Sequence, residues 1–130
     1  MQAIHGIPLI QFEQIVCNKY INKIKDARRR ELEFSLTFAE FRALLTKKRC
    51  AYTGVPLTFH IDGAKQTNTD LSIERIDNSR GYVRGNVMAV CYAANNIKSV
   101  FEDPNTFLSV KDAVRMFGKI DQLQKIKKAA

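Results

Sequence analysis

Apolar side chains in the first third of the chain recur at helical spacing. Between residues 9 and 24 they lie mostly three or four positions apart, at Leu9, Ile10, Phe12, Ile15, Val16, Tyr20, Ile21 and Ile24. This pattern predicts an amphipathic helix. Pro8 suits its first turn, where a missing N–H costs nothing, and we expect the helix to end in the run Arg28, Arg29 and Arg30.

A second helix is predicted to begin after Thr37. Thr37 and Glu40 have the spacing of a capping box, in which each side chain accepts a hydrogen bond from the other residue's backbone N–H. The expected buried stripe consists of Phe38, Phe41, Leu44 and Leu45. Three basic residues at positions 47–49 suit the carboxyl end of this helix, because they oppose the negative end of its dipole.

Beyond Cys50 the pattern changes to turns and short β-rich segments. Residues 52–56 and 62–68 have the composition of a turn and a polar loop. Residues 71–77 and 86–91 are β-rich, and the segment between them contains two glycines that allow a tight loop. The sequence therefore predicts two strands joined by an irregular loop.

Helices are predicted to follow the second strand. The first should run from about Tyr92 to about Phe101. A further capping box, formed by Ser109 and Asp112, begins a last helix. Its expected apolar stripe is Val110, Ala113, Val114 and Phe117, and Gly118 is a point where it could bend.

These elements predict an α+β fold in which helices frame a hairpin-plus-helix unit. Neither a repeat nor an inter-domain linker is visible, so we expect a single domain over residues 1–130. Within it we distinguish a basic helical part (1–49), a core with the order strand, strand, helix (50–101) and a C-terminal helix (102–130).

The charge balance indicates a polyanionic partner. The chain has a net charge of +8, and ten Lys and Arg stand against four Asp and Glu between residues 19 and 49. Such a field favours nucleic acid or an anionic membrane surface. No apolar run reaches the roughly 18–20 residues of a membrane span, and the N-terminus does not resemble a signal peptide. With only three cysteines, we expect reduced thiols and a cytoplasmic protein.

One stretch resembles a known catalytic motif. Glu-Arg-Ile-Asp at 74–77 is followed by Gly-Tyr at 81–82, Gly-Asn-Val at 85–87 and Asn-Asn-Ile-Lys at 95–98. Together with Cys50-Ala-Tyr-Thr-Gly-Val-Pro-Leu57, this order resembles HNH endonucleases (the ββα-metal, or His-Me finger, superfamily), in particular a branch frequent in bacteriophages. The resemblance covers residues 50–101 and implies DNA as the partner, expected as duplex, and hydrolysis of a phosphodiester as the reaction.

By this resemblance, Glu74 and Asn95 occupy the family's metal positions. A hard cation such as Mg²⁺ (or Mn²⁺) takes oxygen ligands and keeps several waters, so one carboxylate and one amide oxygen can suffice. Such a cation stabilises the charge that grows on a phosphoryl group. Glu74 departs from the usual Asp by one methylene, and the alternative is a solvated strand residue paired with an arginine.

Arg75 stands where most HNH enzymes carry the histidine that acts as general base. A guanidinium keeps its proton and cannot be that base, but it can grip a phosphate. The remaining base candidates are Tyr52, Tyr82, His60 and a metal-bound hydroxide. A catalytically impaired HNH protein that only binds nucleic acid is the alternative, and a structural interaction protein is a third class.

Supporting roles are expected for the loop. Asn86 matches the family's central Asn, which ties the loop together through side-chain hydrogen bonds. Asp77 either orients Arg75 or begins the loop as an Asx turn. The residues expected to contact DNA phosphates, each with solvent exposure as the alternative, are Arg80, Arg84, Lys98, Arg28, Arg29 and Arg30.

The zinc clamp of many HNH proteins is incomplete here. The two Cys-x-x-Cys positions contain Cys50-Ala-Tyr-Thr53 and Cys91-Tyr-Ala-Ala94. Two thiolates cannot complete a tetrahedral structural site, so we predict no structural zinc. Instead, Cys50 and Cys91 should face each other in an apolar interior with Phe41, Leu57 and Val90.

Overall fold

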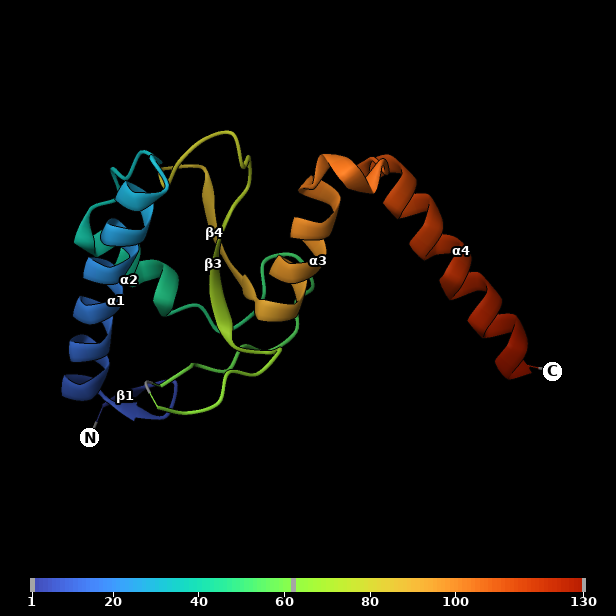
Figure 1. Cartoon of the computed structure of the whole chain (residues 1–130). Coiled ribbons are helices and arrows are strands. Elements are labelled where there is room, and N and C mark those ends of the chain that lie inside the picture. The colour runs from blue at the N-terminus through green and yellow to red at the C-terminus, as the bar shows by residue number, and fades with distance from the viewer. Residues whose placement is uncertain (1, 62, 130) are drawn as a thin grey trace. The chain divides into compact units, whose positions relative to one another are not determined.

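The computed structural model describes residues 2–61 and 63–129, with side chains to residue 128. Its elements are β1 (Ala3–Ile4), β2 (Ile7–Pro8), α1 (Leu9–Arg29), α2 (Phe38–Leu45), β3 (Leu71–Arg75), β4 (Val87–Cys91), α3 (Tyr92–Glu102), the 3-10 helix η1 (Pro104–Thr106) and α4 (Val110–Ala129). The chain is thus a mixed α/β protein, as Figure 1 shows. It forms two compact units, Met1–Asn95 and Asn96–Ala130, and the single-domain organisation stays a prediction.

Helix α1 confirms the first amphipathic pattern, although part of the expected stripe lies in solvent. Phe12, Ile15 and Val16 are buried. Ile10 is 86% exposed and Ile21 50% exposed, because each residue advances about 100° around a helix and these two fall on the far side. Pro8 lies one residue before the helix, as its N-cap.

Helix α2 begins as predicted. The Thr37 hydroxyl accepts from the Glu40 N–H (3.1 Å) and the Glu40 carboxylate accepts from the Thr37 N–H (2.9 Å). Phe41 and Leu45 are buried, whereas Phe38 is 37% exposed. The helix ends at Leu45, before the basic residues at 47–49.

A short hairpin at the N-terminus, β1–β2, was not anticipated. Its turn residues His5 and Gly6 have φ values of 55° and 72°. The ring of His5 stacks on Phe59 at 4.9 Å between centroids, and its Nε2 lies 2.6 Å from the Leu45 carbonyl oxygen. This hairpin therefore covers one end of the core through tertiary contacts that have no local sequence signal.

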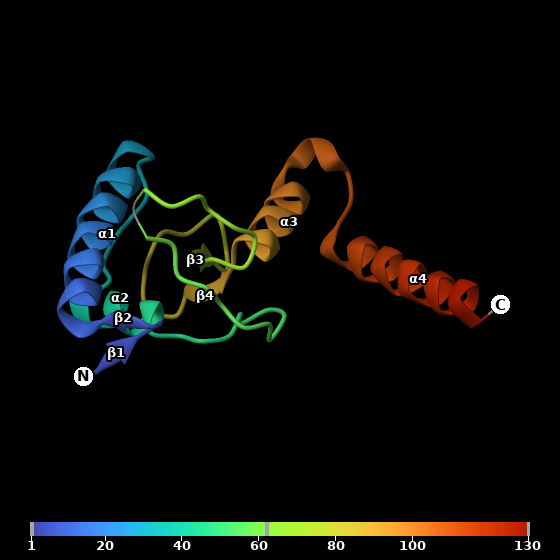
Figure 2. The same ribbon diagram turned by 90° about the horizontal axis from the view of Figure 1, so that it is seen from below.

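The two predicted strands form the antiparallel hairpin β3–β4, with Glu74 opposite Met88 and Arg75 opposite Val87. Helices α1 and α2 pack on one face of this hairpin, as both views indicate (Figures 1 and 2). The main core lies between them and includes Phe12, Ile15, Val16, Leu36, Phe41, Leu45, Ile73 and Tyr82.

Strand alternation divides the side chains of β3 between two environments. Ile73 belongs to the core beneath α1 and α2, so its neighbours Ser72 and Glu74 face the opposite side of the hairpin. On that side lies a second buried cluster: Cys50, Leu57, Ala89, Val90 and Cys91. Phe41, expected in this cluster, instead packs in the main core, because it is on the inner face of α2.

The loop between β3 and β4 is attached to the segment that links α1 to α2. The Tyr82 N–H donates to the Glu33 carbonyl (2.8 Å), and the Ser35 N–H donates to the Tyr82 carbonyl (3.0 Å). Gly81 is required at this crossing, because a Cβ there would lie 2.2 Å from the Glu33 carbonyl oxygen. The β3–β4 loop is thus positioned by Glu33 and Ser35, which are far from it in sequence.

Residues 96–130 contain the rest of α3, η1 and α4. The capping box of Ser109 and Asp112 is present, with both hydrogen bonds at 3.1 Å. Gly118 does not interrupt α4, which Figure 2 shows as one continuous helix. Of its expected stripe only Ala113 is buried, and Val110, Val114 and Phe117 are exposed. No helix in the described part of the chain has the length and apolarity needed to cross a membrane.

Candidate active site

Glu74 is a buried carboxylate on β3. Its residue is 5% exposed, and its Oε2 atom takes no hydrogen bond from the described residues, although Glu74 makes another polar interaction. Burial of a carboxylate is costly unless cationic or hydrogen-bonding groups compensate it. A buried carboxylate on the α3 side of the hairpin is therefore a candidate ligand for a cation.

Asn95 reaches the same side of β3 from the first turn of α3. Its Nδ2 donates to the Ser72 hydroxyl at 2.8 Å, and Ser72 shares a strand face with Glu74. The start of the helix is held by the Tyr92 N–H, which donates to the Asp70 carbonyl (2.8 Å), and by the Ala93 N–H, which donates to the Asn68 carbonyl (3.0 Å). These bonds bring the amide of Asn95 to the carboxylate-bearing face of β3.

The segment before β3 carries a second buried carboxylate, Asp70. Its oxygens accept from the Thr58 hydroxyl (2.6 Å) and the Thr67 N–H (2.8 Å). Burial works against ionisation of Asp70, but hydrogen bonds from Thr58 and Thr67 outweigh it and lower the pKa of this carboxyl. Asp70 therefore organises the base of β3, and nothing in its local sequence distinguishes it from a surface residue.

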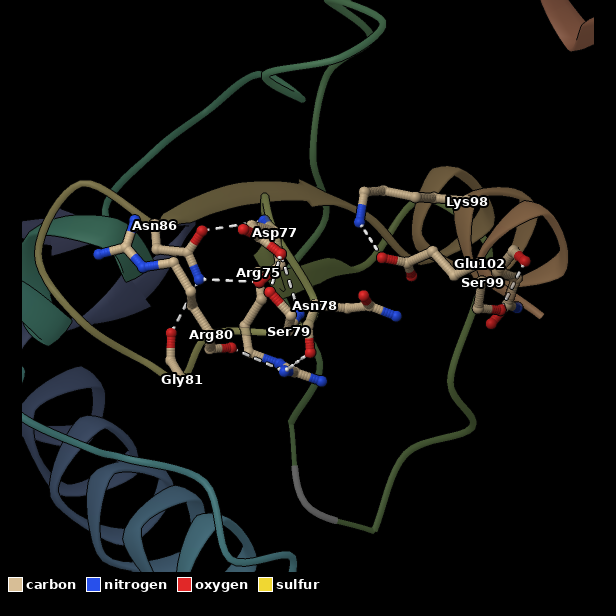
Figure 3. A network of polar contacts seen from close by, with 11 residues as sticks. Arg75, Asp77, Asn78, Ser79, Arg80, Gly81, Asn86, Lys98, Ser99 and Glu102 are labelled. Atoms are coloured by element: carbon tan, nitrogen blue, oxygen red, sulfur yellow. Dashed lines mark hydrogen bonds and ion pairs between the residues drawn. The ribbon is translucent and has the colours of Figure 1, made fainter. Parts of the chain in front are cut away.

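Arg75 lies on the opposite face of β3 from Glu74. Its Nη1 donates to the carbonyl oxygens of Asn78 (2.7 Å) and Arg80 (2.8 Å), and its guanidinium carbon lies 5.6 Å from the centroid of the Tyr82 ring. Figure 3 shows the guanidinium reaching the carbonyl oxygens of the loop. The cation is thus held in place by the loop that follows it.

Asn86 holds the two ends of this loop together. It is 2% exposed, its Oδ1 accepts from the Asp77 N–H (2.9 Å), and its Nδ2 donates to the carbonyls of Asp77 (3.1 Å) and Gly81 (2.9 Å) (Figure 3). Replacing this amide would leave buried backbone groups unsatisfied. The loop conformation that fixes Arg75 therefore depends on Asn86.

Asp77 forms an Asx turn, one of the two alternatives considered. Its Oδ1 accepts from the Ser79 N–H (2.9 Å) and the Ser79 hydroxyl (2.6 Å). Asp77 lies in the loop and not on the strand, because β3 ends at Arg75.

The candidate bases are dispersed. Tyr82 is 4% exposed in the main core, which removes it from contact with an attacking water. His60 is half-buried, and its Nε2 lies 2.8 Å from the Ala64 carbonyl oxygen. Tyr52 is 43% exposed beside Cys50. Among the described residues, no group of three or more His, Cys, Asp and Glu could hold a metal ion.

The predicted phosphate-binding cations are mostly engaged in ion pairs. Arg29 and Arg30 pair with Asp26 at 2.5 and 3.3 Å, Arg84 pairs with Glu40 at 3.3 Å, and Lys98 pairs with Glu102 at 2.5 Å. Arg28 and Arg80 are exposed. The pairs of Arg29, Arg30 and Arg84 expose the arginine and such pairs are weak, so a phosphate could replace the carboxylates there; the Lys98 pair is partly buried.

Two lysines of α1 were missed as site residues. Lys19 Nζ lies 5.4 Å from the centroid of the Phe59 ring, and Lys23 Nζ lies 5.3 Å from that of Tyr82. Lys23 and Arg75 therefore approach the same ring. In the sequence, Lys19 and Lys23 are separated by four positions on a basic helix, which indicates that they lie on one face. This spacing does not indicate which aromatic residues they contact.

Cys50 is a buried thiol with an unusual set of donors. Burial disfavours its thiolate, but hydrogen bonds from Thr53 and from the backbone of Cys91 outweigh this and lower the pKa of Cys50 to about 7. Both Cys50 and Cys91 are free thiols in the second cluster. Their proximity agrees with the expected apolar pairing.

Known proteins resemble this chain in sequence and in fold. No protein-family model matches it. It is 40% identical over 90 residues to an uncharacterised 29.0 kDa protein of Enterobacteria phage T4, covering 63% of this chain and 34% of that protein. It is 33% identical over 95 residues to an uncharacterised protein of Acanthamoeba polyphaga mimivirus, covering 73% and 16%. The chain thus spans about a third and about a sixth of these relatives.

A solved structure provides the fold comparison. The rare-cutting HNH restriction endonuclease PacI aligns with a TM-score of 0.52 and 22% identity, covering 76% of this chain and 72% of PacI. The chain has an HNH-like fold. This agrees with the resemblance noted in residues 50–101, which was found from sequence motifs alone.

Proposed function

We propose that this chain is a divalent-metal-dependent DNA endonuclease that cuts or nicks duplex DNA. The observation that carries the proposal is the 2.8 Å hydrogen bond from Asn95 to Ser72, which supports a site where the amide of α3 and the buried carboxylate of Glu74 share one side of β3. The HNH-like fold and the net charge of +8 support the same function.

The residues present fit a hard cation. Glu74 would supply a carboxylate oxygen and Asn95 its amide oxygen, since its Nδ2 is engaged with Ser72. Mg²⁺ or Mn²⁺ accepts such oxygen donors. When bound, the cation would stabilise negative charge on the phosphoryl and leaving oxygens during hydrolysis.

Arg75 would bind the phosphate that is cut. A guanidinium has five N–H donors, and the two loop carbonyls at Nη1 fix its direction. The Tyr82 ring beside it adds a further electrostatic contact. Because the loop already fixes the Arg75 guanidinium, no ordering of this side chain is needed when the substrate binds. Such preorganisation favours stabilisation of the negative charge that develops on the phosphate during cleavage.

A second candidate, a DNA-binding protein without catalysis, is favoured by Arg75, which stands at the position of the general base in the family that the sequence resembles. A general base must be able to receive a proton from the attacking water, and a guanidinium cannot do so. In this alternative the same cations would bind DNA and no bond would be broken.

Supercoiled plasmid separates the two candidates. The wild-type protein should convert it to nicked or linear DNA with Mg²⁺ and leave it intact with EDTA. Glu74→Gln keeps the shape and removes the charge, and should lower the rate by at least about 100-fold. Glu33→Gln is the matched control, because Glu33 is exposed and only its backbone carries the loop.

The outcomes are distinct. Cutting that persists in Glu74→Gln, while circular dichroism shows both variants folded, would refute the assigned metal ligand. Salt-sensitive retention of DNA without any cutting would support the binding protein. A protein that neither retains nor cuts DNA contradicts both candidates.

A further inference from the structure

A hollow of about 360 Å³ lies between α1 and β3, where Leu71, Ser72 and Ile73 line it. Its apolar lining includes Phe59, Leu71 and Ile73, and its polar lining includes Lys19, Asn22 and Lys23. We propose that this α1–β3 hollow is a nucleotide subsite, which receives one unstacked base of the DNA strand whose phosphate Arg75 binds. The proposal rests on the proposed function and adds to it a site for the substrate.

The apolar lining suits a flat aromatic ring. Phe59 is fixed by its neighbours, with His5 stacked at 4.9 Å and Phe12 edge-on at 5.6 Å. Lys19 Nζ lies over the same ring, 5.4 Å from its centroid, so a base that stacks on Phe59 would displace this flexible side chain toward the phosphate. A rigid aromatic residue beside a cation is the combination on which single-stranded bases stack in proteins that grip the adjoining phosphates.

The charge at the rim is complementary to a nucleotide. Lys19 and Lys23 are half-buried and bring two positive charges to the opening. Asp26 also lines the hollow, but its carboxylate pairs with Arg29 (2.5 Å) and Arg30 (3.3 Å). Among the described lining residues, two lysines thus stand against one aspartate, a balance that favours the phosphate of an entering nucleotide.

The hollow adjoins the proposed phosphate site through Tyr82. Lys23 Nζ lies 5.3 Å and the Arg75 guanidinium carbon 5.6 Å from the centroid of that ring. Ile73, which lines the hollow, precedes Arg75 by two residues, roughly 7 Å along a strand. A strand whose phosphate is on Arg75 can thus place a neighbouring nucleotide at the hollow.

The size and the polar groups favour one base over a larger occupant. Small-molecule sites generally range from about 300 to 1,000 Å³, and this hollow is near the lower limit. The Asn22 amide and the His60 ring line it and can bond to the polar edge of a base. Because bases in a duplex are stacked, occupation requires the base to leave the stack.

Filling the hollow tests the inference. Asn22→Phe places a ring at the opening from an exposed position of α1, so it should not disturb the core. Asn18→Phe is the matched control, an exposed Asn one turn earlier that does not line the hollow. The probes are duplexes containing the mapped cut site, with 2-aminopurine placed at successive positions and EDTA present to prevent cutting.

With wild type and Asn18→Phe, fluorescence should rise severalfold at one position, because 2-aminopurine brightens when it is unstacked. With Asn22→Phe this rise should be absent, and the affinity should fall by about tenfold or more, as for the loss of one stacked base. A second measurement uses wild type alone: 5-bromouracil at that position should crosslink on irradiation to the peptide that carries Phe59 and His60.

The results separate this inference from the proposed function. If wild type cuts DNA but no position brightens, or if crosslinks form only outside the hollow, the subsite is refuted and the nuclease stands. Equal affinity of a folded Asn22→Phe and wild type would also refute the subsite. A protein that does not bind DNA refutes both.

Discussion

Gly81→Ala should be the most damaging single-methyl change in the loop that holds the Arg75 guanidinium. A Cβ at this position would lie 2.2 Å from the Glu33 carbonyl oxygen and 2.7 Å from the Glu33 nitrogen. Both are backbone atoms and cannot rotate away. The loop must therefore move away from the α1–α2 linker by a distance on the order of 1 Å, given ordinary contact distances.

The cost follows from the bonds at this crossing. Separation weakens the Tyr82 N–H to Glu33 carbonyl bond (2.8 Å) and the Ser35 N–H to Tyr82 carbonyl bond (3.0 Å), each worth about 1 kcal/mol. Overpacking itself generally costs about 1–3 kcal/mol. We expect Gly81→Ala to lower the free energy of unfolding by about 2–4 kcal/mol, a large part of the roughly 5–15 kcal/mol of a typical domain.

Urea denaturation followed by circular dichroism measures this loss. Gly85→Ala is the control in the same loop: Gly85 has a φ of +85° and no atom within 4 Å of its added Cβ, so it should cost only the strain of a left-handed residue, about 1–2 kcal/mol. If Gly81→Ala is within about 0.5 kcal/mol of wild type, the loop is not held by Glu33 and the reasoning is wrong.

Two further predictions concern pH and salt. The pKa of Cys50 is lowered from 9.0 to about 7 in the folded protein, so the contribution of its thiolate to stability is present above pH 9 and is lost as the pH falls through 7. The unfolding free energy of wild type should therefore rise by about 2 kcal/mol between pH 7 and 9 relative to that of Cys50→Ala. If the unfolding free energies of the two proteins, measured in urea, change in parallel with pH, the prediction is wrong. If about six cations contact phosphates, a plot of the logarithm of the DNA affinity against the logarithm of the salt concentration should have a slope of about −5. A slope near zero in filter-binding titrations would exclude phosphate contacts as the source of the affinity.

The helices and strands could be predicted because their signals are local. The capping boxes at Thr37 and Ser109 give two helix starts to the residue, since the partners lie three positions apart. The β3–β4 hairpin and the start of α3 could be predicted from the order of the motifs as well as from the β-rich composition of the two strands. In each case the residues that determine the element are close in sequence.

Features that depend on distant contacts could not be predicted. The β1–β2 hairpin is stabilised by His5 against Leu45 and Phe59, and neither partner is visible from residues 3–8. The attachment of Gly81 to Glu33 joins segments almost fifty positions apart. Similarly, Tyr82 is a candidate base by residue type alone, and its burial follows from the packing of the main core.

The faces of β3 impose a constraint on how any phosphate approaches the site. Glu74 and Arg75 are adjacent in sequence, so their side chains leave opposite faces of the strand. One edge of β3 is occupied by its hydrogen bonds to β4. Under the proposed function, a phosphate that contacts both Arg75 and a metal at Glu74 would therefore pass beyond the end of β3, because the strand ends at Arg75 and its other edge is bonded to Thr58 at Leu71. The proposed base subsite is lined by Leu71 and Ile73 of the same strand, so the substrate would follow β3 from its end toward the hollow.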